Sequence, residues 1–373
     1  MSGPVLGVLG GGQLGRMLAL EARAMGVRTR LLDPAPDACS RGVGELITAA
    51  FEDRAAIERF ASGLTAATYE FENVPPETVE RLAGLVSVHP GAASLVAASD
   101  RVAEREALIG AGFGVAKYRV VDGDGSLEEA VGAVGLPGVL KLRRGGYDGK
   151  GQMVVREASG VSGAETWRGG RGAIFEELIP FRRELSIVGM RGADGACRFF
   201  PITENVHRDG ILLTSMAPAP GVSAEVEALA RTHAARLMEE LGHVGVLAVE
   251  LFETGEGLIA NEFAPRVHNT GHWTMDGAAC GQFAQHVRAV LGLALGETRA
   301  LGHAGMVNLV GCLPDIGRVL GVPGTRVHLY EKEARPGRKL GHVNVLAETA
   351  AERDARVAEV LVMLPEGALG GGG

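Results

Sequence analysis

Along the first 115 residues, short apolar runs alternate with stretches of helical spacing. Residues 5–9 (Val-Leu-Gly-Val-Leu) form an apolar run typical of a buried strand. A helical pattern follows, carried by Leu14, Met17, Leu18 and Met25. Gly26 stands where a helix C-terminal cap belongs. Further strands are expected at 27–32, 45–49, 64–71 and 86–89. The alternation of strands and helices predicts a parallel sheet covered by helices over residues 1–115.

The pattern changes near residue 116. From there to about residue 305 strand signals dominate, which predicts an α+β region. Its clearest helix is expected from Ser223, a suitable N-cap, to Leu241. One side of this helix is expected to be apolar, with Val226, Leu229, Ala230, Leu237 and Leu241. The last segment, 306–373, is expected to hold short strands and loops.

A hairpin is expected around Glu256, with apolar strands on either side. In a register centred on Glu256, Glu250 lies opposite Glu262, and both side chains point to one face of a largely buried ribbon. Two buried carboxylates repel each other, and a hydrogen bond of roughly 1 kcal/mol does not offset their desolvation. A divalent cation such as Mg²⁺, bound between the two carboxylates, offsets both their repulsion and their desolvation. Two alternatives stay open: one carboxyl is protonated and shares its proton, or the register slips by a residue.

Composition limits the partners and the location. The net charge is −8 and the pI about 5.8, which excludes a basic nucleic-acid surface. Anionic ligands must therefore bind in local pockets of Arg, Lys and backbone N–H groups. The start of the chain lacks a signal peptide pattern, and no membrane-spanning run is visible. We expect a soluble cytoplasmic protein with four buried, reduced cysteines.

Two glycine-rich segments could bind phosphate. Residues 10–15 (Gly-Gly-Gly-Gln-Leu-Gly) follow a strand and precede a helix, with Asp33 ending the next strand. This pattern fits a dinucleotide, any phosphorylated substrate, or a packing turn. The second segment is a loop at 145–151 that follows Lys141 in an apolar strand. It lacks the P-loop pattern, but together with the Glu250/Glu262 pair it favours ATP over an exposed hairpin tip.

Five segments together carry a family resemblance: GGGQLGRML at 10–18, TYEFENVP at 68–75, KLRRGGYDGKGQ at 141–152, NEFAPRVHNTGHWT at 261–274 and YEKEARPGRKLGHV at 330–343. The chain resembles the ATP-grasp superfamily and, within it, the carboxyaminoimidazole ribonucleotide synthase family. The resemblance implies a Rossmann-like pre-ATP-grasp domain at 1–115. It also implies an ATP-grasp body of two α+β lobes at 116–305 and a small β-rich domain at 306–373.

The resemblance also implies site residues. The implied nucleotide contacts are Arg101, Lys141, Gly146, Tyr147, Asp148, Gly149, Lys150, Gly151, Gln152, Glu176, Glu177, Leu178, Ile179, Glu184, His207, Asn261 and Glu262. The implied metal ligands are Glu250 and Glu262, and the implied catalytic residues are Asp148, Lys150, His268 and Asn269. The implied substrate lining is Gly12, Gln13, Leu14, Glu72, Asn73, Tyr147, Lys332, Arg338 and Lys339. The hairpin register centred on Glu256 would turn Asn261 away from the metal unless a bulge intervenes.

The activity that the resemblance implies is that of an ATP-grasp ligase of purine biosynthesis. Such an enzyme carboxylates 5-aminoimidazole ribonucleotide with ATP, Mg²⁺ (or Mn²⁺) and bicarbonate, through carboxyphosphate. A cytoplasmic homodimer is the family expectation, without nucleic-acid or membrane partners. Two alternatives stay open: a formate-dependent glycinamide ribonucleotide formyltransferase of the same superfamily, and a nicotinamide-dependent oxidoreductase or non-catalytic nucleotide-binding module.

Overall fold

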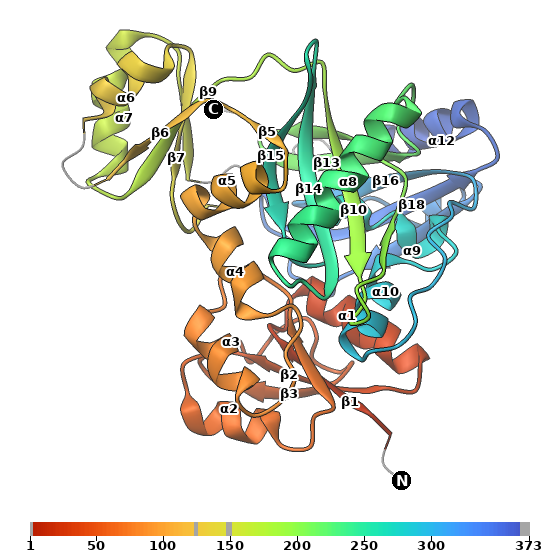
Figure 1. The fold of residues 1–373 in the computed structure, drawn as a ribbon. Helices are drawn as coiled ribbons and strands as arrows, with labels where there is room; N and C mark the ends of the chain where they lie inside the picture. The colour runs from red at the N-terminus through yellow and green to blue at the C-terminus, as the bar shows by residue number, and fades with distance from the viewer. Residues whose placement is uncertain (1–2, 123–125, 147–150, 366–373) are drawn as a thin grey trace.

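The structure is a computed structural model that describes residues 3–122, 126–146 and 151–365. Three sheets organise these residues (Figure 1). An N-terminal parallel sheet, a small antiparallel lobe and one large mixed sheet follow one another along the chain. Among the helices of the described residues, none combines the length and apolar character needed to cross a bilayer.

The N-terminal sheet has the strand order β3-β2-β1-β4, and every pairing in it is parallel, as predicted. Its strands are β1 (Val5–Leu9), β2 (Arg28–Asp33), β3 (Glu45–Thr48) and β4 (Ala66–Tyr69). Its helices are α1 (Gln13–Ala24), α2 (Arg54–Ala61) and α3 (Pro76–Ala83). Gly26 has a φ of 73° just beyond α1, as its predicted place at the helix end requires. The strand predicted at 86–89 is reduced to a single bridge between Ala67 and Val88.

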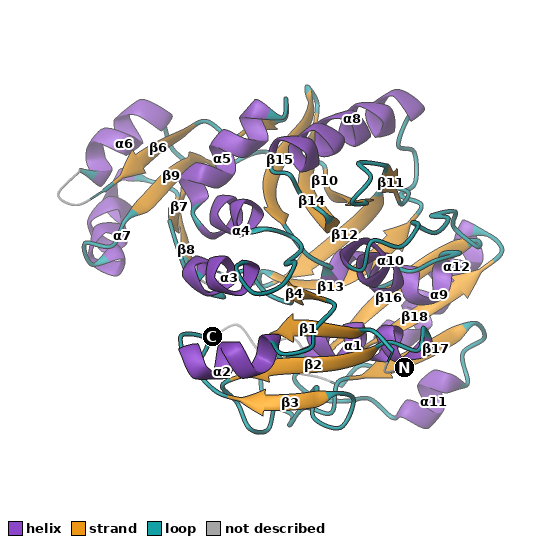
Figure 2. Cartoon of the chain, turned by 60° about the horizontal axis from the view of Figure 1, so that its bottom comes forward, coloured by secondary structure: helices purple, strands orange, loops and turns teal. Residues whose placement is uncertain are grey.

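Two helices, α4 (Ala92–Ser99) and α5 (Arg101–Gly110), lead from this sheet to the small lobe. The lobe has the strand order β6-β9-β7-β8, with antiparallel pairings. Its elements are β6 (Tyr118–Val121), α6 (Leu127–Val134), β7 (Gly138–Leu142), β8 (Gln152–Val155), η1 (Ala158–Gly160), α7 (Val161–Arg168) and β9 (Ala173–Glu177). In both views α6 and α7 lie on the side of this lobe that faces away from the large sheet (Figures 1 and 2).

The large sheet has the order β17-β18-β16-β13-β12-β10-β14-β15-β5, and β11 pairs with β10. Its pairings are antiparallel except that of β15 with β5. The strands are β5 (Gly114–Val115), β10 (Arg183–Arg191), β11 (Cys197–Phe199), β12 (Thr203–Arg208), β13 (Ile211–Ala217), β14 (Gly245–Thr254), β15 (Gly257–Ala264), β16 (His303–Val310), β17 (Thr325–Leu329) and β18 (Lys339–Ala347). The β-rich C-terminal segment thus extends this sheet.

The helices around the large sheet are α8 (Ala224–Glu240), η2 (Asn269–Gly271), α9 (Thr274–Gly277), α10 (Gln282–Val290), α11 (Ile316–Leu320) and α12 (Ala350–Val362). The helix predicted from Ser223 is confirmed as α8, and the Ser223 side chain accepts the Val226 N–H. Its predicted apolar side is wrong at Leu229, which is 52% exposed, while Ala234 and Met238 are buried instead. Helix α12 corrects the expectation of short strands and loops in the last segment.

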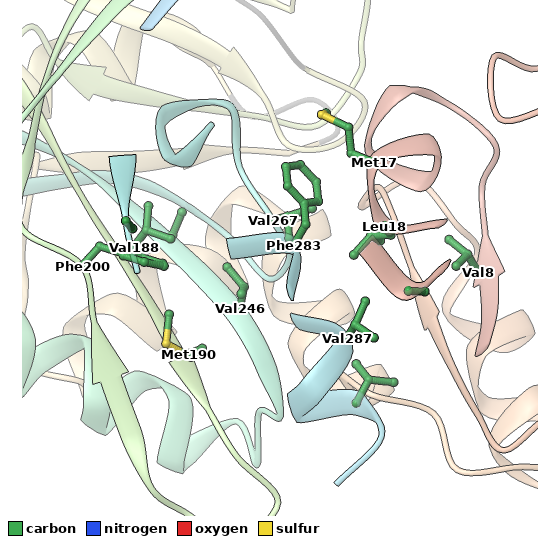
Figure 3. Packing of buried hydrophobic residues seen from close by; sticks show 14 of the residues in the cluster. Val8, Met17, Leu18, Val188, Met190, Phe200, Val246, Val267, Phe283 and Val287 are labelled. Atoms are coloured by element: carbon green, nitrogen blue, oxygen red, sulfur yellow. The ribbon is translucent and has the colours of Figure 1, made fainter. Parts of the chain in front are cut away.

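One hydrophobic core joins the N-terminal sheet to the large sheet. Met17 and Leu18 of α1 belong to the same buried cluster as Phe283 and Val287 of α10 (Figure 3). Val188 of β10 continues this cluster into the large sheet. This shared core packs the two sheets, which form two walls of the candidate site, against each other.

Candidate functional site

The hairpin of β14 and β15 brings Glu250 and Glu262 directly opposite each other, as predicted. The predicted centre at Glu256 is wrong, because Thr254 pairs with Gly257 across a two-residue turn. A register shift next to Glu250 restores the pairing by inserting Asn261 as an extra residue. This bulge also removes the conflict over Asn261: its side chain accepts a hydrogen bond from Lys141 (3.2 Å) and lines the same cavity as the two glutamates.

The two carboxylates are in different electrostatic environments. Arg101 donates to Glu262 at 2.8 Å and, against the opposing effect of burial, holds the pKa of Glu262 low. Burial and then the charge of Glu262 raise the pKa of Glu250. Among the described residues, the His268 imidazole lies close to Glu250, with Nε2 3.6 Å from the carboxylate. Burial lowers the pKa of His268 to about 3, so this imidazole is neutral at pH 7. The side chains of Glu250 and Glu262 are 16% and 37% exposed, so they are less buried than expected but accessible to a cation.

A cavity of about 290 Å³ lies over this hairpin, between the small lobe and the large sheet. The predicted nucleotide residues that line it are Arg101, Lys141, Gln152, Glu176, Glu177, Leu178, Ile179, Glu184, His207, Asn261 and Glu262. Glu250 lines it as well. Of the predicted loop, Gly146 lines a neighbouring cavity and Gly151 lines neither. The predictions for Tyr147, Asp148, Gly149 and Lys150 lie outside the described residues.

Buried ion pairs support the floor of this cavity. Lys141 contacts the Glu176 carboxylate at 2.7 Å, and Arg105 of α5 contacts it at 2.6 Å. Burial raises the pKa of Glu176, but the two cations outweigh it and hold this pKa at about 2. Arg105 also contacts Glu104 (3.3 Å), which in turn contacts Arg101 (3.0 Å). Sequence reasoning missed Glu104 and Arg105, because charged residues at helical spacing look the same whether they face solvent or a core.

A second cavity, of about 460 Å³, lies between the N-terminal sheet and the large sheet. Five residues of the predicted substrate lining face it: Gln13, Leu14, Glu72, Asn73 and Lys339. Glu72 pairs there with Arg266 at 2.5 Å. Gly12, Lys332 and Arg338 lie outside its lining. Lys332 donates to the side chain of Gln13, a lining residue, and so contacts the cavity wall from outside the lining. Arg338 donates to the Glu333 carbonyl oxygen at 3.3 Å.

The start of α1 holds a protein carboxylate, at the turn whose sequence fits a dinucleotide, another phosphorylated substrate or a packing turn. The buried Glu70 accepts the N–H groups of Gly12 and Gly15, each at 2.5 Å. Asp33 accepts the N–H of Gly11 at 2.7 Å. A Cβ at Gly12 would lie 2.5 Å from the Glu70 carboxylate, so this glycine is required for packing. The turn is thus already satisfied internally, which removes the basis for a dinucleotide site.

The two cavities meet at a shared set of side chains. Five residues line both of them: Arg101, Glu262, His268, Asn269 and Lys339. The set includes two cations, one predicted metal ligand and the predicted catalytic pair His268 and Asn269. A group transferred between ligands in the two cavities would pass this junction. The arrangement therefore suits transfer between a nucleotide in the smaller cavity and a second substrate in the larger one.

Three family models match successive parts of the chain. A ribonucleotide synthetase preATP-grasp domain matches residues 4–99, an ATP-grasp domain matches 106–283, and a phosphoribosylaminoimidazole carboxylase C-terminal domain matches 304–356. The N5-carboxyaminoimidazole ribonucleotide synthase of Pseudomonas aeruginosa is 44% identical over 359 residues, covering 96% of this chain and 99% of that protein. That of Bacillus subtilis is 39% identical, covering 94% and 93%.

Solved structures agree with these relatives. An N5-carboxyaminoimidazole ribonucleotide synthetase from Thermus thermophilus superimposes with a TM-score of 0.93 at 46% identity, covering 97% of this chain and 99% of that one. An Aspergillus clavatus synthase in complex with ADP and 5-aminoimidazole ribonucleotide gives 0.90 at 28% identity, covering 97% and 98%. The likeness therefore extends over nearly the whole chain and includes all three units.

Proposed function

Because the chain belongs to the N5-carboxyaminoimidazole ribonucleotide synthase family, we propose that it carboxylates the amine of 5-aminoimidazole ribonucleotide with ATP and bicarbonate. The observation that carries this proposal is the pair of cavities with five shared residues. The Aspergillus clavatus relative holds ADP and the ribonucleotide together, which is what two adjoining sites require. The relatives support carboxylation and not the formyltransferase alternative.

ATP is proposed to occupy the smaller cavity, with its phosphates directed to the junction. Glu250 and Glu262 would hold Mg²⁺, or Mn²⁺, because two carboxylates leave coordination places for phosphate oxygens and water. When bound, this ion neutralises charge on the transferred phosphoryl group. Lys141, Glu184 and His207 would contact the nucleotide, and the segment Glu176–Ile179 would face its base. The loop at 146–152 would cover the phosphates.

The ribonucleotide is proposed to occupy the larger cavity, with its amine toward His268 and Asn269. Bicarbonate attacks the γ-phosphorus, so an O–P bond forms to give carboxyphosphate as the bond to ADP breaks. The amine nitrogen then forms a C–N bond with the carboxyl carbon. Inorganic phosphate leaves and takes up the proton that the amine loses. Arg101 and Lys339 lie at the junction and stabilise the negative charge in both steps.

The remaining family expectations are also part of the proposal. We place unit boundaries at 1–115, 116–305 and 306–373, which the matched ranges 4–99, 106–283 and 304–356 support. Asp148 and Lys150 are assigned to the catalytic set from the matching motif. A cytoplasmic homodimer is the proposed assembly, and it rests on the family resemblance.

An ADP-release assay tests the function directly. ADP formation at the full rate is expected only when ATP, Mg²⁺, bicarbonate and 5-aminoimidazole ribonucleotide are all present, with carbon from labelled bicarbonate appearing in the product. A parallel reaction with formate and glycinamide ribonucleotide is expected to be inactive. Turnover that does not depend on the aminoimidazole substrate, or that requires formate, would overturn the proposal.

A further inference from the structure

The side chain of Asn269 is held by a second amide that touches neither cavity. Asn308 lies in β16, is fully buried, and is absent from both linings. Its Nδ2 donates to Asn269 Oδ1 at 2.8 Å, and its Oδ1 accepts from Asn269 Nδ2 at 3.1 Å. The two residues form a reciprocal amide pair between the C-terminal part of the large sheet and the junction of the cavities.

The orientation of this pair is fixed by a third group. Asn308 Nδ2 also donates to the backbone carbonyl of Leu212, in β13, at 2.8 Å. A carbonyl oxygen only accepts, so the nitrogen of Asn308 must face it and the amide cannot be reversed. Reversal of the Asn269 amide would then bring two donors together and two acceptors together. The position of each polar atom of Asn269 is therefore determined by Asn308.

The backbone beside Asn269 is fixed independently. Gln282, the fully buried first residue of α10, accepts the His268 N–H with Oε1 at 2.9 Å. Its Nε2 donates to the His268 carbonyl at 2.7 Å. These two bonds hold the chain in place immediately before Asn269. Rotation of the Asn269 side chain is the freedom that remains, and Asn308 removes it.

We propose that Asn308 is a positioning residue that turns the Asn269 amide toward the reacting groups; this inference rests on the proposed function. With one N–H and one acceptor site used by Asn308, Asn269 keeps one N–H and one acceptor site for ligands. The N–H would donate to an oxygen of carboxyphosphate. The Oδ1 acceptor would receive a hydrogen bond from the substrate amine. Both groups are aligned at the junction before the C–N bond forms.

A crystal structure of Asn308→Leu tests the geometric claim whatever the substrate is. Leucine has the branched shape of asparagine but its side chain forms no hydrogen bond, so the sheet should keep its strand pairing while the amide pair is lost. The Asn269 side chain is expected to rotate or to show more than one conformer. An Asn269 side chain unchanged in position and hydrogen-bonding direction would overturn the proposal.

Steady-state kinetics with a double-mutant cycle test the functional claim. Asn308→Leu should lower kcat for carboxylation by about 10- to 100-fold, as loss of an orienting partner does elsewhere, with little change in KM for ATP. In an Asn269→Ala background the same substitution should lower kcat by less than about twofold, because the Asn269 amide that Asn308 orients is already absent. Equal losses in both backgrounds, or no loss in the first, would contradict the proposal.

A control variant and a fallback variant separate positioning from general damage. Asn205→Leu removes another buried amide of the large sheet, whose partners Ser186 and Ser215 line neither cavity. It should lower the melting temperature without the selective loss of kcat. If Asn308→Leu does not fold, Asn308→Ser replaces it in the same cycle. If turnover by the wild-type enzyme did not require the aminoimidazole substrate, the proposed function would be wrong. The crystal structure of Asn308→Leu would still test whether Asn308 orients the Asn269 side chain.

Discussion

At the scale of single residues, Glu262 has two roles that a carboxylate seldom combines. It is paired with Arg101, and it faces Glu250 across the hairpin. The pairing keeps Glu262 ionised, so the charge that the proposed Mg²⁺ would need is already present. Burial and then the charge of Glu262 raise the pKa of the opposing carboxylate, Glu250, so a bound cation would favour its ionised form. The pair is thus asymmetric, and Glu262 is its permanently charged member.

Substitution of Glu262 by Gln tests this asymmetry. The amide keeps the size of the side chain but removes its charge, so Mg²⁺-dependent ADP formation should fall by about 100-fold or more. ADP release at saturating ATP over a range of Mg²⁺ concentrations measures the loss. Glu253→Gln is the matched control, because Glu253 lies on the same hairpin, pairs with Arg183, and lines neither cavity. Near-normal turnover of Glu262→Gln with normal Mg²⁺ dependence would remove the metal assignment.

At the scale of elements, helix α5 connects the ion pairs beneath the smaller cavity. Arg105 contacts Glu176 on β9 and Glu104 on its own helix, and its side chain is 1% exposed. Glu104 also accepts the backbone N–H of Phe263, next to Glu262, at 3.0 Å. The helix therefore links the strand that carries Glu176 to the strand that carries Glu262. A substitution of Arg105 should therefore displace side chains on both strands, which form two walls of the cavity.

Replacement of Arg105 by Met should destabilise the protein and weaken ATP binding. The substitution leaves Glu104 and Glu176 with one cation fewer each, and loss of a buried partner costs roughly 3 kcal/mol. Lys141 loses its fixed carboxylate geometry, so KM for ATP should rise. Thermal unfolding and ATP kinetics measure the two effects. Arg105→Lys should lower the melting temperature and raise KM for ATP less than Arg105→Met. Glu106→Gln, on the exposed side of α5, should have the melting temperature and the KM of the wild type. An unchanged melting temperature for Arg105→Met would contradict the prediction.

Sequence patterns predicted the helices and strands of this site more completely than its side-chain contacts. The parallel sheet, helix α8 and the Glu250/Glu262 pair follow from apolar periodicity and strand pairing, which are local properties. The bulge at Asn261 does not, because a bulge depends on how the hairpin bends in the sheet. The Asn269–Asn308 pair joins residues 39 positions apart through tertiary packing. Nothing in either local sequence marks that contact.

At the scale of the whole molecule, two buried histidines join the N-terminal unit to the large sheet. His286 accepts the Val246 N–H with Nδ1 (3.0 Å), so its Nε2 must carry the proton and donate to Thr68 Oγ1 (2.8 Å). His243 donates from Nε2 to the Val246 carbonyl (3.1 Å) and accepts from Ser94 with Nδ1 (3.0 Å). Both rings are therefore neutral in the folded protein. These contacts lie between the N-terminal unit and the large sheet, both of which also line the larger cavity.

Acid should loosen this boundary, since a proton added to His286 Nδ1 would face the Val246 N–H, and a charge on either ring would be buried without water. Burial lowers the pKa of His286 to about 3, and burial, then Arg191 and His89, lowers that of His243 to about 4. The unfolded chain, with a histidine pKa of about 6.5, binds more protons below that pH. Stability is thus complete above about pH 6.5 and falls as the pH drops toward 4, by roughly 2 kcal/mol per histidine between pH 7 and 5.

Melting temperatures from pH 7 to pH 5 measure this dependence. His286→Gln can still accept from Val246 and donate to Thr68, but it does not titrate, so its melting temperature should fall less on acidification than that of the wild type. His303→Gln, at the start of β16 and away from this boundary, is the control and should keep the wild-type slope. Parallel slopes for His286→Gln and the wild type would show that the boundary does not sense pH. Because Thr68 lies two residues from Glu70 and four from Glu72, loosening here should also raise KM for the ribonucleotide before it affects ATP.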